Sequence, residues 1–268
     1  MAGRVLVTGG SMGIGAACAQ RLAADGWTVI VAARGREAVE RSVGSLEGDG
    51  HEALVLDVGE PAAWEAAKPT LSRLDALVHA AAVIGPIGAA EEIDPAAFLD
   101  VLRINVLGTF LAAQHCLPAL RAGGGPIVAF SGGGATGPLA RYDAYAASKA
   151  ATARLVENLA ADGVRINAVA PGFVATRMHE ATLEAGPESA GSDYHAKTLG
   201  QLDSGGTSPE VAAELVAFLL SDAAQGISGR LISAPWDPWR EPAFQERLRT
   251  EPALATLRRI DDQFFTTA

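Results

Sequence analysis

The sequence predicts an α/β fold in which one doubly wound parallel sheet of about seven strands carries helices on both faces. Short runs rich in Val, Ile and Leu alternate with longer, Ala-rich segments of helical periodicity. The first run ends in a glycine-rich turn, Thr8–Gly15, that leads directly into a helical pattern. With 268 residues, 49% of them hydrophobic, the chain has enough apolar material for one sizeable core.

The predicted strands and helices alternate along the chain. The strands are Arg4–Val7, Thr28–Ala32, Ala53–Leu56, Ala76–His79, Pro126–Phe130, Arg165–Val169 and Arg230–Ser233. The helices between them are Gly15–Asp25, Arg36–Leu46, Pro61–Leu71, Pro95–Leu120, Tyr142–Ala161 and Pro209–Leu220. We find no internal repeat and no composition shift that would mark a domain boundary, so residues 1–235 are predicted to form one domain.

Two segments depart from this rhythm. The stretch from Thr176 to Gly206 is rich in Gly, Glu and Ser and carries one or two weak helical patterns. It follows the carboxyl end of a strand, where α/β proteins bind ligands, and is a candidate substrate lid. Residues 236–268, which include the amphipathic segment Glu241–Arg249, are predicted to pack on the same domain as a C-terminal extension.

Composition argues against several classes of protein. Two cysteines, Cys18 and Cys116, are too few for a disulfide framework or a metal cluster, so no metal site is expected. A net charge of −10 without a Lys/Arg-rich block argues against nucleic-acid binding. No uninterrupted apolar run reaches the roughly 18 residues of a membrane span, and the start lacks a secretory signal pattern, so we expect a cytoplasmic protein.

The glycine-rich turn is a candidate dinucleotide site. Its glycines allow a tight turn and a close backbone approach, so that amides at the helix N-terminus can face a pyrophosphate. Turns use glycine in any case, and the position after the first strand is what favours a nucleotide. The expected contacts are Gly9, Ser11, Met12, Gly13, Ile14 and Gly15.

The end of the second strand indicates which dinucleotide binds. An acidic residue there would bind the ribose 2′-hydroxyl of NAD, whereas an arginine accommodates the 2′-phosphate of NADP. Ala33 and Arg34 occupy this turn, and a guanidinium forms charge-assisted bonds to phosphate. We therefore expect NADP(H) in preference to NAD(H); the alternative is that Arg34 is only a solvated loop charge.

Tyr145 and Lys149 form a candidate acid/base pair. Their four-residue spacing near the start of a predicted helix places the phenol and the ammonium on one face, one turn apart. A neighbouring ammonium, together with the positive charge of an oxidised nicotinamide, favours phenolate, so we expect a lowered tyrosine pKa. Taken alone, this spacing also fits an ordinary pair on a helix surface.

The motifs together resemble the short-chain dehydrogenase/reductase family, of the single-domain type that includes 3-oxoacyl-carrier-protein reductases and ketoreductases. The resemblance covers nearly the whole chain, from Thr8–Gly15 through Asp57, Asn105 and Tyr145/Lys149 to Pro171-Gly172. It implies a Rossmann-like fold and hydride transfer between a nicotinamide dinucleotide and a carbonyl or secondary alcohol of a small molecule.

The resemblance also implies roles for individual residues. Tyr145 would donate a proton to the substrate oxygen, Lys149 would lower its pKa and bind nicotinamide ribose, and Asn105 would help to hold a water in a proton relay. The alternative for Asn105 is a polar residue that kinks its helix with a satisfied side chain. A homotetramer or homodimer through the two longest helices is implied as well. Further cofactor contacts are expected at Asp57, Val58, Ala80, Ala81, Pro171, Gly172, Val174 and Thr176.

The chain departs from the family pattern in two places near the expected site. Thirteen residues before the tyrosine, where the family has its catalytic serine, stands Gly132, and Ser131 precedes it. We expect flexible glycines to let Ser131 serve as the donor to the substrate carbonyl, with Thr136 as a weaker substitute. His79 stands where the family commonly has asparagine, and a structural role is expected for it.

Other functions remain to be weighed against a reductase. A non-catalytic dinucleotide sensor would keep the fold and lose the chemistry, and the departure at Gly132 is its only support. An NAD-preferring alcohol or sugar dehydrogenase would use the same residues. An extended epimerase or dehydratase would need a larger C-terminal domain than the chain after Leu231 provides.

Overall fold

The computed structural model describes residues 3–175 and 177–258. All neighbouring strands pair in parallel, in the order β3-β2-β1-β4-β5-β6-β7. The doubly wound α/β fold is thereby confirmed. Each predicted strand lies within one residue of the observed bounds, which are β1 Arg4–Thr8, β2 Thr28–Ala33, β3 Glu52–Val55, β4 Ala76–His79, β5 Ile127–Phe130, β6 Ile166–Ala170 and β7 Leu231–Ser233.

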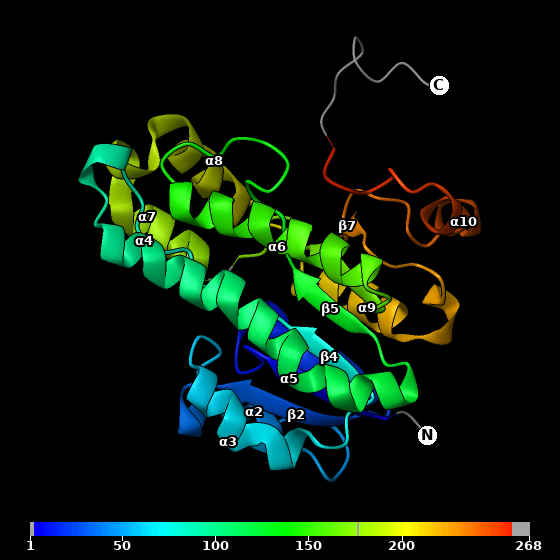
Figure 1. Ribbon diagram of the computed structural model, residues 1–268. Coiled ribbons are helices and arrows are strands. Elements are labelled where there is room, and N and C mark those ends of the chain that lie inside the picture. The colour runs from blue at the N-terminus through cyan, green and yellow to red at the C-terminus, as the bar shows by residue number, and fades with distance from the viewer. Residues whose placement is uncertain (1–2, 176, 259–268) are drawn as a thin grey trace.

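Helices cover both faces of the sheet and enclose two apolar cores. One core joins the sheet to α1 (Gly13–Ala24), α2 (Arg36–Gly44) and α9 (Pro209–Leu220). The other joins it to α3 (Pro61–Leu71) and to the helices α5 and α6, which lie across the near face of the sheet in Figure 1. The inner strands β1, β2, β4, β5 and β6 are buried on both faces and are continuous apolar runs, whereas the edge strand β3 is largely exposed.

The predicted helix Pro95–Leu120 is interrupted. It consists of α4 (Pro95–Leu102), a π-helical turn at Arg103–Leu107 and α5 (Gly108–Gly123). The whole run Pro95–Gly123 is long and apolar enough by composition to cross a bilayer. Its apolar residues are interrupted by polar ones, so the search for uninterrupted apolar runs did not predict it. Its buried side chains, Leu111 and Cys116 among them, belong to the core beneath the sheet, as expected of a core helix.

The candidate lid forms two helices at the carboxyl edge of the sheet. These are α7 (Arg177–Ala190), kinked at Gly186 with φ +72°, and α8 (Ser192–Asp203). Helix α6 (Asp143–Ala161) begins beneath them, and Tyr142 just before it donates a hydrogen bond from its hydroxyl to Thr182 Oγ1 at 3.0 Å. Short 3-10 turns at Ala90–Glu92 and Asp222–Ala224 complete the helices outside the extension.

The described part of the C-terminal extension, residues 236–258, covers the edge of the sheet at β7, and residues 259–268 of the predicted extension lie outside the described residues. Arg230 is 7% exposed, and its guanidinium donates to the carbonyls of Leu248 in α10 (Pro242–Thr250), of Pro252 and of Leu254, each at 2.9 Å. The amide of Leu231 donates to the carbonyl of Ala255 at 2.7 Å. One buried guanidinium therefore anchors the segment that closes this edge.

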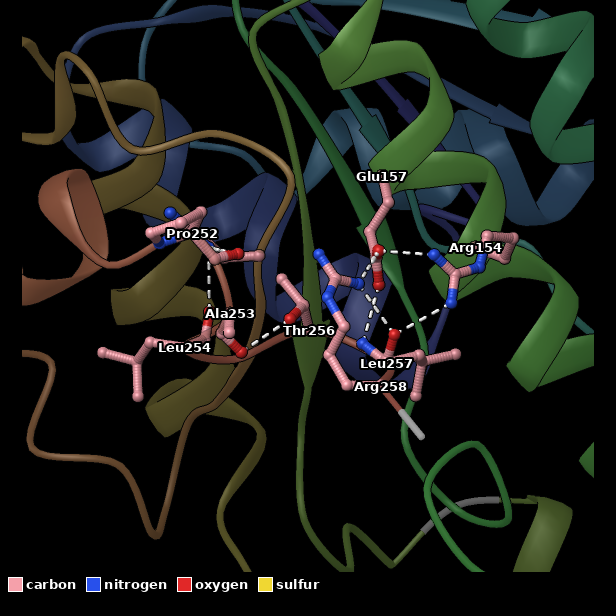
Figure 2. A network of polar contacts seen from close by, with 9 residues as sticks. Arg154, Glu157, Pro252, Ala253, Leu254, Thr256, Leu257 and Arg258 are labelled. Carbon is pink, nitrogen blue, oxygen red and sulfur yellow. Dashed lines mark hydrogen bonds and ion pairs between the residues drawn. The ribbon is translucent and has the colours of Figure 1, made fainter. Parts of the chain in front are cut away.

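A second anchor ties the same segment to α6. The Glu157 carboxylate accepts from the amide of Leu257 at 2.7 Å and pairs with Arg154 and Arg258 at 2.7 and 2.6 Å, as Figure 2 shows. Arg154 also donates to the Leu257 carbonyl at 2.8 Å. The extension thus holds β7 and α6 together from outside.

We predict that Arg230→Met destabilises the protein by about 2–4 kcal/mol, because one buried and two partly buried carbonyls lose a charged donor. Urea unfolding followed by circular dichroism measures the change. The matched control is Arg247→Met, which removes an exposed pair with Glu251 and is expected to cost less than about 1 kcal/mol. Equal effects of the two substitutions would contradict the anchoring role.

Candidate active site

A cavity of about 530 Å³ opens at the carboxyl edge of the sheet. Its lining comes from the turns after β1, β4, β5 and β6, from the start of α6, from α7 and α8, and from the residues after β7. Of the predicted site residues, those that line it are Ile14, Ala80, Ser131, Thr136, Tyr145, Lys149, Pro171, Gly172 and Val174. The strand order places these distant sequence segments together because parallel strands end at the same edge.

The glycine-rich turn has the close contacts that its sequence predicts. A Cβ on Gly15 would lie 2.2 Å from the Gly9 carbonyl oxygen, and one on Gly9 would lie 2.7 Å from the amide nitrogen of Ala81. Helix α1 begins at Gly13 with no side-chain cap and no acidic residue in its first turn. Its N-terminal amides therefore fit an anionic group such as a pyrophosphate.

The remaining cofactor candidates lie outside the cavity lining. The Asp57 carboxylate accepts from the amide of Gly59 at 2.9 Å and lies 3.8 Å from Arg103. Val58 is buried, and its carbonyl accepts from the Trp64 indole at 2.9 Å. Arg34 is exposed after β2, and no ion pair among the described residues involves it. Thr176 lies outside the described residues.

Tyr145 and Lys149 lie one turn apart in α6, as predicted, and both line the cavity. The Lys149 ammonium is 5.4 Å from the centroid of the Tyr145 ring and donates to the Phe130 carbonyl at 3.1 Å. Lys149 is 4% exposed, and this burial lowers its pKa to about 8. The lysine can therefore gain or lose a proton near neutral pH.

The expected lowering of the tyrosine pKa is not found in the protein by itself. Burial raises the pKa of Tyr145, and the neighbouring Tyr194 raises it further. The expectation took account of the ammonium and of an oxidised nicotinamide but not of lost hydration, and burial disfavours phenolate strongly here. Lowering the pKa of Tyr145 toward 7 therefore needs positive charge beyond that of Lys149.

Asn105 lies in the π-helical turn and has a fully engaged side chain. Its amide oxygen accepts from the Val83 amide at 2.8 Å, and its nitrogen donates to the Val83 carbonyl at 2.8 Å and to Ser148 Oγ at 2.9 Å. Its backbone carbonyl accepts from the Thr109 hydroxyl at 2.6 Å. This is the satisfied, structural arrangement, and it joins the turn after β4 to α6.

Ser131 does not present its proton to the cavity. Its hydroxyl donates to the backbone carbonyl of Lys149 at 2.8 Å, and the residue is 3% exposed. The expectation that Ser131 is the donor to a substrate carbonyl is corrected accordingly: the hydroxyl ties β5 to α6. Ser131 directly follows β5, which packs against α6, so the helix carbonyl lies within hydrogen-bond reach of its hydroxyl.

His79 braces the two central strands, in line with its expected structural role. Its Nδ1 lies 2.9 Å from Thr8 Oγ1, whereas its buried Nε2 has no partner among the described residues. Burial and then the nearby Lys149 charge lower the pKa of His79 to about 3. The imidazole is therefore neutral at physiological pH, and it adds no second positive charge beside Lys149.

Several cavity residues were not assigned from sequence. Phe173 packs on His179 with ring centroids 3.7 Å apart, and Tyr142 packs on Tyr194 at 5.0 Å. His179 and Tyr194 belong to the substrate lid that the sequence predicts, and both line the cavity. Other unassigned members of the lining are Lys197, Gln201 and Trp236.

We predict that Gly132→Ser, which restores the family's residue type, destabilises the protein by about 1–3 kcal/mol. Gly132 has φ +115°, a conformation that serine rarely adopts. Gly137→Ser is the matched control, because its added Cβ meets nothing within 4 Å and its φ is not in that region. Equal urea midpoints for the two variants would contradict this prediction.

We also predict that Lys149→Met stabilises the protein at pH 7. The folded lysine has a pKa of about 8 against 10.5 when unfolded, so the unfolded chain binds more protons between these values. The cost of burying the ammonium is full below pH 8 and falls as pH rises to 10.5. The gain of the variant, on the order of 2–3 kcal/mol at pH 7, should shrink across this window.

Urea unfolding at pH 7 and pH 10 measures this dependence. Lys68→Met serves as the control, since Lys68 is an exposed lysine of α3 paired with Glu65. A stability difference between Lys149→Met and the parent chain that stays constant from pH 7 to 10 would refute the depressed lysine pKa.

Comparison with known proteins gives a consistent result. The profile of the family described as enoyl-(acyl carrier protein) reductase matches residues 9–234. Dehydrogenase/reductase SDR family member 4 of Bos taurus is 33% identical over 240 residues, which are 85% of this chain and 84% of the relative. Cis-4-hydroxycyclohexanecarboxylate dehydrogenase of Sinomonas cyclohexanicum is 36% identical over 244 residues, 85% and 93% of the two chains.

Solved structures agree in fold. A variant of actinorhodin polyketide ketoreductase, in a crystal structure with NADPH, has a TM-score of 0.77 at 26% identity, covering 87% of this chain and 95% of that one. The profile match and the relatives at more than 30% identity cover most of the molecule described above. The chain belongs to the short-chain dehydrogenase/reductase family and is an NAD(P)-dependent oxidoreductase of carbonyl or alcohol groups.

Proposed function

We propose that this protein is an NADP(H)-dependent ketoreductase in which Tyr145 exchanges a proton with the substrate oxygen. The observation that carries the proposal is the position of Tyr145 and Lys149 on one cavity, with the ammonium 5.4 Å from the ring centroid. The dinucleotide, when bound, supplies the hydride and, once oxidised, a positive charge. A positive charge beside the phenol favours phenolate, and it therefore lowers the tyrosine pKa that burial raises.

Lys149 holds and relays protons in this proposal. Its ammonium is fixed by the Phe130 carbonyl at 3.1 Å, which leaves two protons for the ribose and for a relay to water. A pKa of about 8 lets it give up a proton and regain it near neutral pH. Asn105 positions the helix through Ser148, and a relay water held by this turn remains part of the proposal.

The preference for NADP(H) rests on Arg34. Its guanidinium is exposed at the end of β2, and no carboxylate among the described residues neutralises it, whereas Arg36 and Arg41 on α2 pair with Glu40 and Glu37. One structural relative is a ketoreductase solved with NADPH. A free arginine at this turn suits a 2′-phosphate.

We also propose a homodimer or homotetramer that uses the helices of the near face. Leu99 in α4, Leu107 in the π-helical turn and Phe110 in α5 are 62%, 38% and 41% exposed. Large apolar side chains gathered on one helical run are typical of a surface that another subunit covers.

The test of the function is Tyr145→Phe. We expect NADPH oxidation with a panel of cyclic and aromatic ketones to fall at least about 100-fold, because the proton donor is lost. Binding of NADPH, followed by its fluorescence, should persist. A variant that turns over as fast as the parent would refute the role of Tyr145. A parent chain that binds NADPH but reduces none of the ketones would favour the sensor.

Cofactor choice is tested with Arg34→Ala. We expect the ratio of kcat/KM for NADPH over NADH to fall at least about tenfold, because a charge-assisted bond to the 2′-phosphate is lost. Arg41→Ala is the control, because Arg41 lies in the following helix α2 and is already paired with Glu37. It should leave the ratio within twofold. An unchanged ratio in Arg34→Ala would show that this arginine is only a surface charge.

A further inference from the structure

The outer part of the cavity is formed by α8 and by the turn that follows β7. On α8, Tyr194, Lys197 and Gln201 are spaced at i, i+3 and i+7, and all three line the cavity. This spacing makes them one face of the helix. From the other segment come Trp236 and Asp237. None of these residues belongs to the catalytic pair.

Trp236 is 73% exposed although it lines the cavity, whereas Trp239 three residues later is 4% exposed. The buried indole donates to the Ala234 carbonyl at 3.0 Å and packs on Phe218. The Asp237 carboxylate accepts from the Ser233 amide at 2.7 Å, and its own amide donates back to the Ser233 carbonyl at 3.2 Å. The turn is therefore pinned on both sides of Trp236.

A pinned turn that exposes a large aromatic surface at a cavity is suited to contact with a ligand. An indole exposed to water contributes little to the stability of the fold. A planar ring stacked on it would bury apolar area of both partners. The aromatic side chains of Phe173, Tyr142 and Tyr194 continue this lining inward. The cavity volume of about 530 Å³ is in the range of small-molecule sites.

Lys197 provides a positive charge at the same place. It is exposed, and no ion pair among the described residues involves it. The carboxylate of Asp237, the only acidic side chain among the described residues of the lining, is held by the Ser233 amide. Together with Lys149 the lining therefore carries two cationic groups against one carboxylate, in a chain whose net charge is −10. Such a local field attracts anions.

We propose that Trp236 and Lys197 determine substrate specificity, and that the substrate is a ring-bearing ketone with a carboxylate. The ring stacks on Trp236, the carboxylate binds Lys197, and the ketone oxygen faces Tyr145. This inference rests on the proposed reductase function, because it assigns the outer end of the same site. It gives the C-terminal extension a part in recognition, as the turn at Trp236 is where that extension begins.

The experiment compares 4-acetylbenzoate with its methyl ester as substrates in the presence of NADPH. The two compounds share the ring and the ketone and differ in charge. We expect the parent chain to favour the acid by at least about tenfold in kcat/KM, mainly through a lower KM. The reason is that only the acid can form a charge-assisted bond with Lys197. In Lys197→Gln this acid-to-ester ratio should fall to about one. Lys68→Gln, which changes a lysine of α3 away from the cavity, should keep the parent ratio.

Trp236 is tested separately. Trp236→Ala should raise KM for the acid and the ester alike, and Trp236→Phe should recover most of the loss, because it keeps a ring to stack on. An acid-to-ester ratio that Lys197→Gln leaves unchanged would overturn the role of the lysine. KM values that Trp236→Ala leaves unchanged would overturn the role of the indole.

Titration calorimetry separates failure of this inference from failure of the proposed function. If no ketone is reduced by the parent chain, binding of 4-acetylbenzoate in the presence of NADP⁺, weakened at least about tenfold by Lys197→Gln, still supports the recognition site. If simple ketones such as cyclohexanone are reduced while 4-acetylbenzoate is neither reduced nor bound, the specificity assignment is wrong and the reductase stands.

Discussion

The parallel pairing of seven strands is the constraint on which the site depends. Because all strands run the same way, the ends of β1, β4, β5 and β6 meet at one edge. The register places Thr8 beside His79 and His79 beside Ala129, so that the glycine-rich turn, the turn after β4 and the carbonyl that holds Lys149 become neighbours. A shift of one residue would turn these groups to the other face of the sheet.

The electrostatics of the site follow from this packing. Burial lowers the pKa of the Lys149 ammonium and raises the pKa of the Tyr145 phenol. Because His79 is neutral at physiological pH, it adds no further positive charge near Lys149. The protein by itself therefore lowers the pKa of Lys149 and raises that of Tyr145, so the two values move apart and the phenol does not become acidic. In the proposed function, the positive charge of an oxidised nicotinamide favours the phenolate.

Much of the fold and of the inner site was predictable from sequence, for physical reasons that particular residues show. Strands buried on both faces are continuous apolar runs, and a four-residue spacing puts Tyr145 and Lys149 on one helix face whatever the tertiary structure. The π-helical turn at Arg103–Leu107 was not predictable, because one extra residue in a turn barely alters apolar periodicity. The direction of the Ser131 hydroxyl and the sign of the tyrosine pKa shift depend on neighbours that are distant in sequence.

The hydrogen bond from Leu231 to Ala255 has a consequence for assembly. The last strand of an open sheet offers unpaired amides and carbonyls to which another chain can add a strand. Here residues from the same chain already occupy that position, and Arg230 and Glu157 hold them there. Continuous sheets that run from one subunit into the next are therefore blocked at β7, and protection against edge-to-edge aggregation is built into the end of the polypeptide.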